Sequence, residues 1–138
     1  MTWEMIRLIK AVYRATISGC PRTKKNSPQI RRGRNGRRYV APSDAFLSYQ
    51  DRAGWELRNR PDEPLDGTYN VRVLYYMDSL RRVDLSNLLE STCDILTHYG
   101  ILKDDNSRIV CSHDGSRVLL DREHPRAEIY IEEAESDG

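Results

Sequence analysis

Alternation of apolar and polar residues predicts the strands of this chain. In residues 12–18, Tyr13, Ala15 and Ile17 alternate with polar side chains, which is the period of a half-buried strand. The longest alternation covers residues 69–77 and is the clearest strand in the sequence. Shorter apolar runs predict further strands over residues 108–111, 118–120 and 127–131. A small sheet is therefore expected, with its strands spread over most of the chain.

Two segments have the periodicity of helices. Ser43 is a suitable N-cap for the first, although Gly54 weakens that helix by roughly 1 kcal/mol relative to alanine. Its apolar positions are Phe46, Tyr49, Ala53 and Leu57. The second helix is predicted from about Ser86 to Tyr99, with Gly100 as its stop. It has an apolar stripe of Leu85, Leu88, Leu89, Thr92, Leu96 and Tyr99 opposite a polar face of Asn87, Glu90, Asp94 and His98.

The order of these elements predicts an α+β domain. We expect a small mixed or antiparallel sheet with two main helices packed on one face and a long basic loop after the first strand. A length of 138 residues fits a single domain over 1–138, with a core of about 12–133 and an acidic tail over 133–138. The apolar content leaves a thin margin for a monomeric core, so pairing with a second copy would help.

A net charge of +1 hides a very uneven distribution of charge. From Arg22 to Arg38 there are eight basic residues and no acidic one, together with Pro28, Gly33 and Gly36, so the segment is interpreted as a long, mobile loop. Such a block suits a polyanion. The end of the chain has the opposite sign and is interpreted as a solvated tail that contains Glu132, Glu133, Glu135 and Asp137.

Several classes of protein are disfavoured by what the sequence lacks. Cys20, Cys93 and Cys111 are odd in number and have no Cys-x-x-Cys spacing, which argues against a disulfide framework or a zinc site. With no signal-peptide run and no apolar stretch of ~18 residues, a cytoplasmic protein without a membrane partner is expected. Phosphate-loop, zinc-protease and serine-hydrolase motifs are missing. Carboxylates remain as the candidate chemical groups.

The candidate carboxylates flank the second helix. Asp84 lies between a strand end and the helix start, and Asp104 and Asp105 occupy the turn that follows the helix. Periodicity alone interprets Asp84 as a cap and the later pair as an ordinary acidic turn. A helix of about 14 residues spans ~21 Å, so these carboxylates meet only if the chain folds back.

A gapless run from Asp84 to Asp105 resembles the core signature of RusA-type Holliday junction resolvases. The resemblance extends more loosely from about Val12 to Glu133. The run is Arg81-Arg82-Val83-Asp84-Leu85-Ser86-Asn87-Leu88-Leu89-Glu90, then Cys93-Asp94-Ile95-Leu96 and Lys103-Asp104-Asp105, and the looser elements are Gly19, Pro21, Lys24 and Lys25.

That resemblance implies homodimeric enzymes that cut branched DNA with Mg²⁺, or with Mn²⁺ in its place, and with no small-molecule cofactor. It implies that Asp84 and Asp105 are catalytic carboxylates and metal ligands. Two positions depart from the family pattern. Ser86 stands where a second aspartate is expected, and Glu90 stands where a catalytic lysine is expected.

We hypothesise that Glu90 substitutes as a catalytic metal ligand, because residues four apart are neighbours on a helix. Asp104 is a further candidate ligand, and Lys103 is a candidate for the electrostatic role of the missing lysine. Asn87 and Asp94 would support the site. Simpler interpretations remain open: a solvated helix face for Glu90 and Asp94, a backbone-bonding role for Asn87, and an N-cap role for Ser86.

The basic residues are predicted to bind DNA phosphates without reading sequence. They are Lys24, Lys25, Arg31, Arg32, Arg34, Arg37, Arg38, Arg81 and Arg82. The sequence thus favours a magnesium-dependent, structure-selective endodeoxyribonuclease that acts on Holliday junctions in recombination and repair. One alternative is a catalytically impaired protein that binds junctions or other nucleic acid, and another is an RNA-binding accessory protein.

Overall fold

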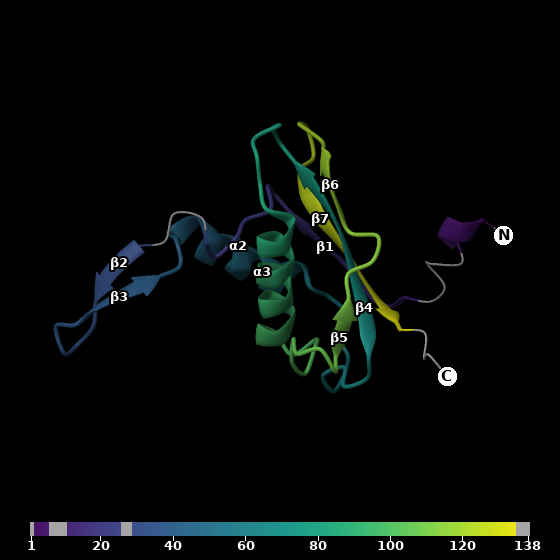
Figure 1. Cartoon of the computed structure of the whole chain (residues 1–138), viewed down its shortest axis with the longest axis horizontal. Helices are drawn as coiled ribbons and strands as arrows, with labels where there is room; N and C mark the ends of the chain where they lie inside the picture. Colours follow the sequence, from purple (N-terminus) through teal and green to yellow (C-terminus); the bar gives the residue numbers. More distant parts are fainter. Residues whose placement is uncertain (1, 6–10, 26–28, 135–138) are drawn as a thin grey trace.

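The computed structural model describes residues 2–5, 11–25 and 29–134 (Figure 1). Apart from a hairpin within the basic block, the strands and helices follow the predicted order, after a short helical stretch at 3–5. Their bounds are β1 (Ala11–Ser18), β2 (Gln29–Arg32), β3 (Arg38–Ala41), α2 (Asp44–Glu56), β4 (Tyr69–Met77), α3 (Leu85–His98), β5 (Val110–Ser112), β6 (Arg117–Leu120) and β7 (Arg126–Glu133).

The main sheet is mixed, as the fold class predicted. β7 lies between β1 and β4 and is antiparallel to both. β5 and β6 run parallel to β4 and share its other edge at successive positions: β5 pairs near Tyr69, and β6 pairs along 74–77. The C-terminal strand therefore lies inside the sheet rather than at its edge, so folding requires contacts between distant parts of the chain.

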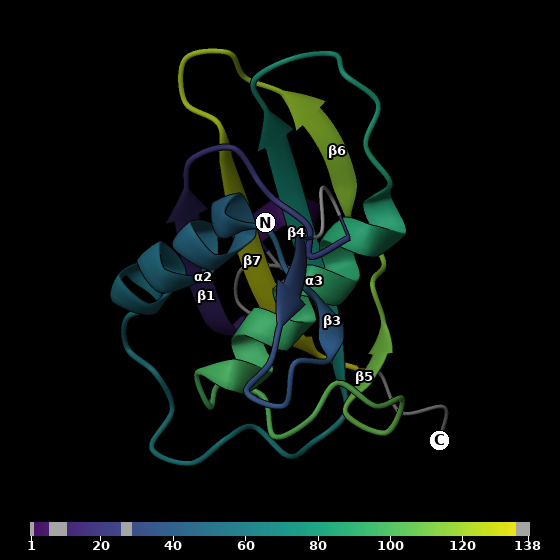
Figure 2. The same cartoon turned by 90° about the vertical axis from the view of Figure 1, so that its left-hand side faces the viewer.

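Both helices cover one face of this sheet (Figures 1 and 2). The alternation in β4 directs Val71, Val73 and Tyr75 toward the helices, and all three are fully buried. The Tyr75 hydroxyl is hydrogen-bonded to the Thr92 hydroxyl of α3 at 2.6 Å, which satisfies a polar atom inside the core. The predicted arrangement of two helices on one face of a sheet is confirmed.

The helix boundaries follow from caps and from one close approach. Ser43 caps α2 as predicted, with its hydroxyl accepting from the Phe46 N–H at 3.1 Å, and Gly100 has a φ of 73° just beyond α3.

Gly54 has a packing role in addition to its low helix propensity. A Cβ at Gly54 would lie 2.7 Å from ring atoms of Tyr99, whose hydroxyl donates to the Gln50 carbonyl at 2.8 Å. The missing side chain is what lets that ring pack against α2.

The basic block does not form the predicted long loop. β2 and β3 pair antiparallel as a separate two-stranded hairpin that extends away from the main sheet (Figure 1). The Gly33 N–H donates to the Arg37 carbonyl at 2.9 Å, and Gly36 has a φ of 76°, so the glycines expected to keep the segment irregular instead form its turn. Pro28 lies outside the described residues.

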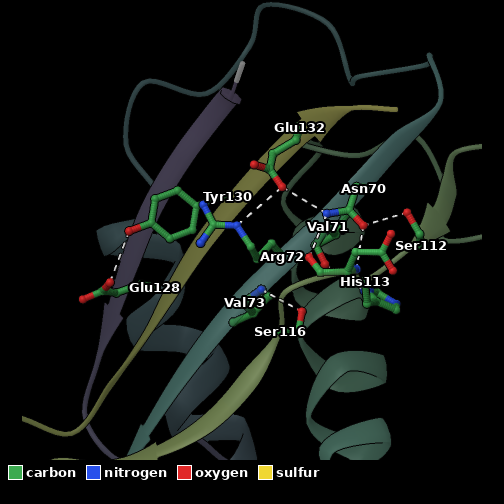
Figure 3. Close-up of polar contacts among 11 residues, drawn as sticks. Asn70, Val71, Arg72, Val73, Ser112, His113, Ser116, Glu128, Tyr130 and Glu132 are labelled. Atoms are coloured by element: carbon green, nitrogen blue, oxygen red, sulfur yellow. Dashed lines mark hydrogen bonds and ion pairs between the residues drawn. The ribbon is translucent and has the colours of Figure 1, made fainter. Parts of the chain in front are cut away.

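The predicted solvated acidic end is wrong for Glu132, which is buried in β7, whereas Glu133 is the last residue of that strand and is exposed. Glu132 is only 6% exposed, accepts from the Asn70 side chain at 3.0 Å and lies 3.5 Å from Arg72 Nε. The Arg72 guanidinium stacks 4.1 Å from the centre of the Tyr130 ring (Figure 3). This buried charge pair therefore belongs to the sheet face opposite the helices. Residues 135–138 of the predicted tail lie outside the described residues.

The cysteines form no disulfide within the described part of the chain. All three cysteines are free thiols, and Cys93 is buried in the core. Within the described part of the chain, neither helix has the length and apolar character needed to cross a bilayer.

Candidate functional site

Asp84 is the N-cap of α3. Its Oδ1 accepts from the backbone N–H of Ser86 at 2.9 Å and of Asn87 at 3.3 Å. These are two of the N–H groups that the first turn of a helix leaves without internal partners. Ser86 is therefore in the first turn, and the prediction that it caps the helix is wrong. Asp84 remains exposed, so its carboxylate faces solvent at one end of α3.

A row of polar side chains on α3 is covered by two lysines from the segment after β1. Lys25 Nζ lies 3.2 Å from Glu90 Oε2, and Lys24 Nζ lies 3.1 Å from Asp94 Oδ2. The Lys24 N–H also donates to the Ser91 hydroxyl at 3.0 Å, which fixes the segment to the helix. Glu90 and Asp94, predicted as a ligand and a supporting residue, thus lie side by side with their charges balanced by ammonium groups.

Asp105 returns to the same helix from the other end. After Gly100 the chain folds back, with the Ile101 N–H donating to the Leu96 carbonyl at 2.9 Å. Some loss of hydration, together with the neighbouring side chains of Asp104 and Asp94, raises the pKa of Asp105 above its ordinary value. The carboxyl groups of Asp94 and Asp105 are therefore neighbours, although they belong to a helix and to the turn that follows it.

The structure separates Asp84 from this pair. Asp94 follows Asp84 by ten residues, which is about 15 Å along a helix axis. Across residues 2–5, 11–25 and 29–134, no group of three or more His, Cys, Asp or Glu side chains is spaced to hold a metal ion. Asp84, Glu90 and Asp105 are thus not gathered into one three-carboxylate cluster. The helix length is the physical reason, since Asp84 caps one end and Asp105 approaches nearer the other.

Asp104 and Lys103 have contacts of their own. The Asp104 carboxylate accepts from the Asp105 N–H at 2.7 Å and from the Asn106 side chain at 3.1 Å, and these bonds lower the pKa of Asp104. Lys103 Nζ lies 3.1 Å from the Asp66 carboxylate. Asp104 therefore shapes the turn that presents Asp105, while the ammonium of Lys103 is directed to another loop. The lysine found beside Glu90 is Lys25.

The predicted DNA-binding residues occupy three places. The hairpin carries five arginines, of which Arg31 pairs with Asp44 at 2.8 Å. Lys24 and Lys25 lie across α3, and Arg81 and Arg82 line a cleft of about 290 Å³ just before Asp84. The hairpin arginines are Arg31, Arg32, Arg34, Arg37 and Arg38.

Two features of this surface were not predicted from the sequence. The hairpin had a detectable signal, because Asn35-Gly36 is a favoured turn pair and Ile30 and Val40 are strand-forming residues. The ion pairs of Lys24 and Lys25 with α3 had none, because they join segments far apart in the chain. Asp94, assigned only a supporting role from the sequence, is the carboxylate that meets Asp105.

An α+β domain that places acidic side chains beside a strongly basic surface has the character of a protein that acts on nucleic acid. The family model described as Endodeoxyribonuclease RusA matches residues 19–132, which is most of the 138-residue chain. The chain belongs to this family, which confirms the resemblance found from Asp84 to Asp105. Membership implies an endodeoxyribonuclease that resolves Holliday junctions and binds branched DNA. No curated protein matches the sequence.

Proposed function

We propose that this protein is a magnesium-dependent, structure-selective endodeoxyribonuclease that cuts Holliday junctions during recombination and repair inside the cell. The observation that carries the proposal is the match of the RusA family model to most of the chain, and the effect of the Asp94 carboxyl group on the pKa of Asp105 beside a basic surface supports it. Two adjacent acidic groups repel each other when both are ionised. A cation between them would relieve that repulsion.

The donor set fits a hard divalent ion. Mg²⁺ is commonly bound through one or two carboxylates, retains several waters and takes further oxygen ligands from phosphate. Asp94 and Asp105 would hold it, with Glu90 and Asp104 as the nearest additional carboxylates on the same helix and turn. When bound, the ion would supply a more acidic water and offset negative charge on the scissile phosphate. Mn²⁺ is expected to serve in its place.

The remaining residues bind and orient the DNA. Lys24 and Lys25 hold Asp94 and Glu90 in place and present ammonium groups to phosphates that approach α3. Asp84 anchors the first turn of α3 through its Oδ1, and its exposed carboxylate directly follows Val83, which lines the cleft of Arg81 and Arg82. The arginines of the hairpin supply contacts that depend on charge and not on base sequence.

We further propose that the active form is a homodimer. A four-way junction has two-fold symmetry, and paired symmetric cuts require two active sites, which a symmetric dimer supplies. Sedimentation of the free protein and of its junction complex would measure the number of copies. One copy per junction in the complex would contradict this part of the proposal.

The central experiment is cleavage of a synthetic four-way junction and of a linear duplex of the same sequence, with Mg²⁺, with Mn²⁺ and with chelator. We expect metal-dependent cutting of the junction only. Asp105→Asn should abolish cutting, and Asp94→Asn should reduce it at least tenfold. The matched control is Asp62→Asn, which changes an exposed aspartate in the loop after α2. Wild-type protein that cuts nothing over a broad range of metal and pH would contradict the proposal.

A second candidate is a junction-binding protein without nuclease activity. It is favoured by the scattered carboxylates, since no group of three in the described residues can hold a metal, and by the lysines that already neutralise Glu90 and Asp94. This candidate predicts salt-sensitive junction binding with no cleavage under any metal. Turnover that Asp105→Asn abolishes would exclude it.

A further inference from the structure

A second basic surface lies apart from the hairpin, where the end of β1 meets α2 and the loop before α3. Two clefts adjoin there and share Cys20 and Arg22. The first has a volume of about 200 Å³ and is lined by Cys20, Arg22, Ala45, Ser48, Tyr49 and Arg52. The second, of about 290 Å³, continues past Arg81 and Arg82 to Val83, the residue before Asp84.

Few acidic side chains of the described residues lie among the positive charges in these clefts. Among the described residues, no ion pair includes any of the four arginines Arg22, Arg52, Arg81 and Arg82. One carboxylate, Asp78, lines the second cleft, where it accepts from the Cys20 thiol at 3.4 Å. Glu56 lines neither cleft, and its carboxylate is oriented toward β1 by the Ser18 N–H and hydroxyl at 2.8 and 2.6 Å. Four arginines therefore line the two clefts, and Asp78 is the one acidic residue named among the lining residues.

The backbone holds Arg52 in this position. Gly19 has a φ of 90°, and a Cβ on it would meet Arg52 Nη1. The same nitrogen lies 3.4 Å from the Ser18 carbonyl, a long contact that orients the guanidinium and leaves its other N–H groups available. Gly19 is itself fixed by its N–H, which donates to the Pro125 carbonyl at 3.0 Å. A glycine in the left-handed region thus makes room for the arginine at the mouth of the cleft.

The base of the first cleft is polar and neutral. Tyr49 is buried, and in the described part of the chain its hydroxyl has no hydrogen-bond partner. Burial raises the pKa of Tyr49 above its ordinary value, so the phenol keeps its proton. The Ser48 hydroxyl is exposed on the same helix. A ligand in this cleft would meet two guanidinium groups and a serine donor, a set that suits a phosphate oxygen and repels a cation.

We propose that Arg22 and Arg52 seat one phosphate of a DNA strand, and that Arg81 and Arg82 hold the adjoining part of that strand on its way to Asp84. The inference rests on the proposed function, because it assumes that DNA is the polyanion. It adds a contact that neither the motif nor the hairpin contains, since Arg22 and Arg52 come from outside both. The strand path runs from α2, past Cys20, to the start of α3.

The test is junction binding in chelator, measured by fluorescence anisotropy over a range of salt concentrations. Each phosphate contact contributes about 0.9 to the slope of log affinity against log salt. Arg52→Ala should lower that slope by about one contact and weaken binding several-fold. Arg52→Lys should restore most of the slope. The matched control is Arg58→Ala, an exposed arginine just beyond α2 that lines neither cleft.

A second variant guards against misfolding of the first. Ser48→Asp places a negative charge inside the cleft and should weaken junction binding tenfold or more. Gln50→Glu adds the same charge on the opposite side of α2 and should have little effect. Normal slope and affinity in both Arg52→Ala and Ser48→Asp would overturn the inference. If Arg52→Ala is unfolded by circular dichroism, Ser48→Asp decides alone.

Two outcomes separate this inference from the proposed function. Wild-type protein that binds junctions with the predicted slopes but never cuts them would contradict the nuclease and leave the phosphate seat standing. Wild-type protein that cuts junctions, while the variants bind them normally, would contradict only the proposed phosphate contact of Arg22 and Arg52. A last experiment measures the Tm with inorganic phosphate. Suppose that phosphate raises the Tm of wild type but not of Arg52→Ala, while the salt dependence of junction binding is the same in both proteins. The cleft would then bind free phosphate and not DNA.

Discussion

Asp84 has two possible roles that a pair of substitutions can separate. As a cap, it needs only an oxygen that accepts from the N–H groups of Ser86 and Asn87. As a catalytic group, it needs a negative charge. Asparagine retains the accepting oxygen and removes the charge, whereas alanine removes both. The cap role and the catalytic role therefore predict different effects of Asp84→Asn.

The expected changes in stability follow from the geometry. Loss of the cap in Asp84→Ala should cost about 1 kcal/mol, within a range of about 0.5–2. For a domain of this length, 1 kcal/mol corresponds to a fall in Tm of roughly 3–5 °C. Asp84→Asn loses only the attraction between the carboxylate and the helix dipole, about 0.3–1 kcal/mol. Its Tm should lie closer to that of wild type than to that of Asp84→Ala.

Thermal unfolding followed by circular dichroism measures the cap, and junction cleavage with Mg²⁺ measures the charge. We expect Asp84→Asn to lose at least tenfold in cleavage rate while its Tm stays near the wild-type value. Equal Tm losses in the two variants would refute the capping geometry. Wild-type cleavage by Asp84→Asn would show that Asp84 serves only to start α3.

Three further changes have defined outcomes. Glu90→Gln should reduce metal-dependent cleavage and leave the Kd for the junction within about twofold, and unchanged cleavage would remove Glu90 from the metal site. Gly54→Ala gains about 1 kcal/mol of helix propensity but pays about 1–3 for overpacking. It should therefore lower the Tm in wild type and raise it in a Tyr99→Leu background, where a rise in both would contradict the clash. In thiol-labelling experiments on the native protein, exposed Cys111 should react quickly, whereas Cys93, whose pKa burial raises to about 12, should react only on unfolding.

The regular elements could be predicted because their patterns are local. The alternation over residues 69–77 defined β4 with its observed bounds, and Ser43 announced the start of α2. Amphipathic spacing located α3 to within one residue at each end. In each case the buried positions and the caps lie within one element, so a single segment of sequence carries the whole signal.

The errors arose where partners lie far apart in the chain. Glu132 resembled part of a charged tail because its partner Arg72 belongs to β4, and only the pairing of β4 with β7 brings the two together. The hairpin strands have four residues each, and their arginines concealed the apolar positions that mark a strand. In both cases a highly charged segment was predicted to be irregular, whereas the structure has a strand there.

The candidate site was predicted only in part, because the motif is local whereas the distances between its residues depend on the fold. The motif identified Asp84 and Asp105 as residues of interest, and the family match supports that part of the sequence. Their spatial relation depends on how far the chain folds back after Gly100, which no periodicity encodes. The fold-back brings Asp105 toward Asp94 and not toward Asp84, so we expect the exposed face of α3 to carry the chemistry.

The hairpin of β2 and β3 has a consequence for how this protein tolerates change. Ile30 and Val40 face each other across its strands, yet they are 72% and 71% exposed. Almost none of the surface of this arm is buried against the domain, so its composition is nearly free of the demands of folding. Natural selection on the hairpin residues would therefore depend mainly on what the hairpin binds. We expect that its length and its charge can change without loss of the fold of the main domain.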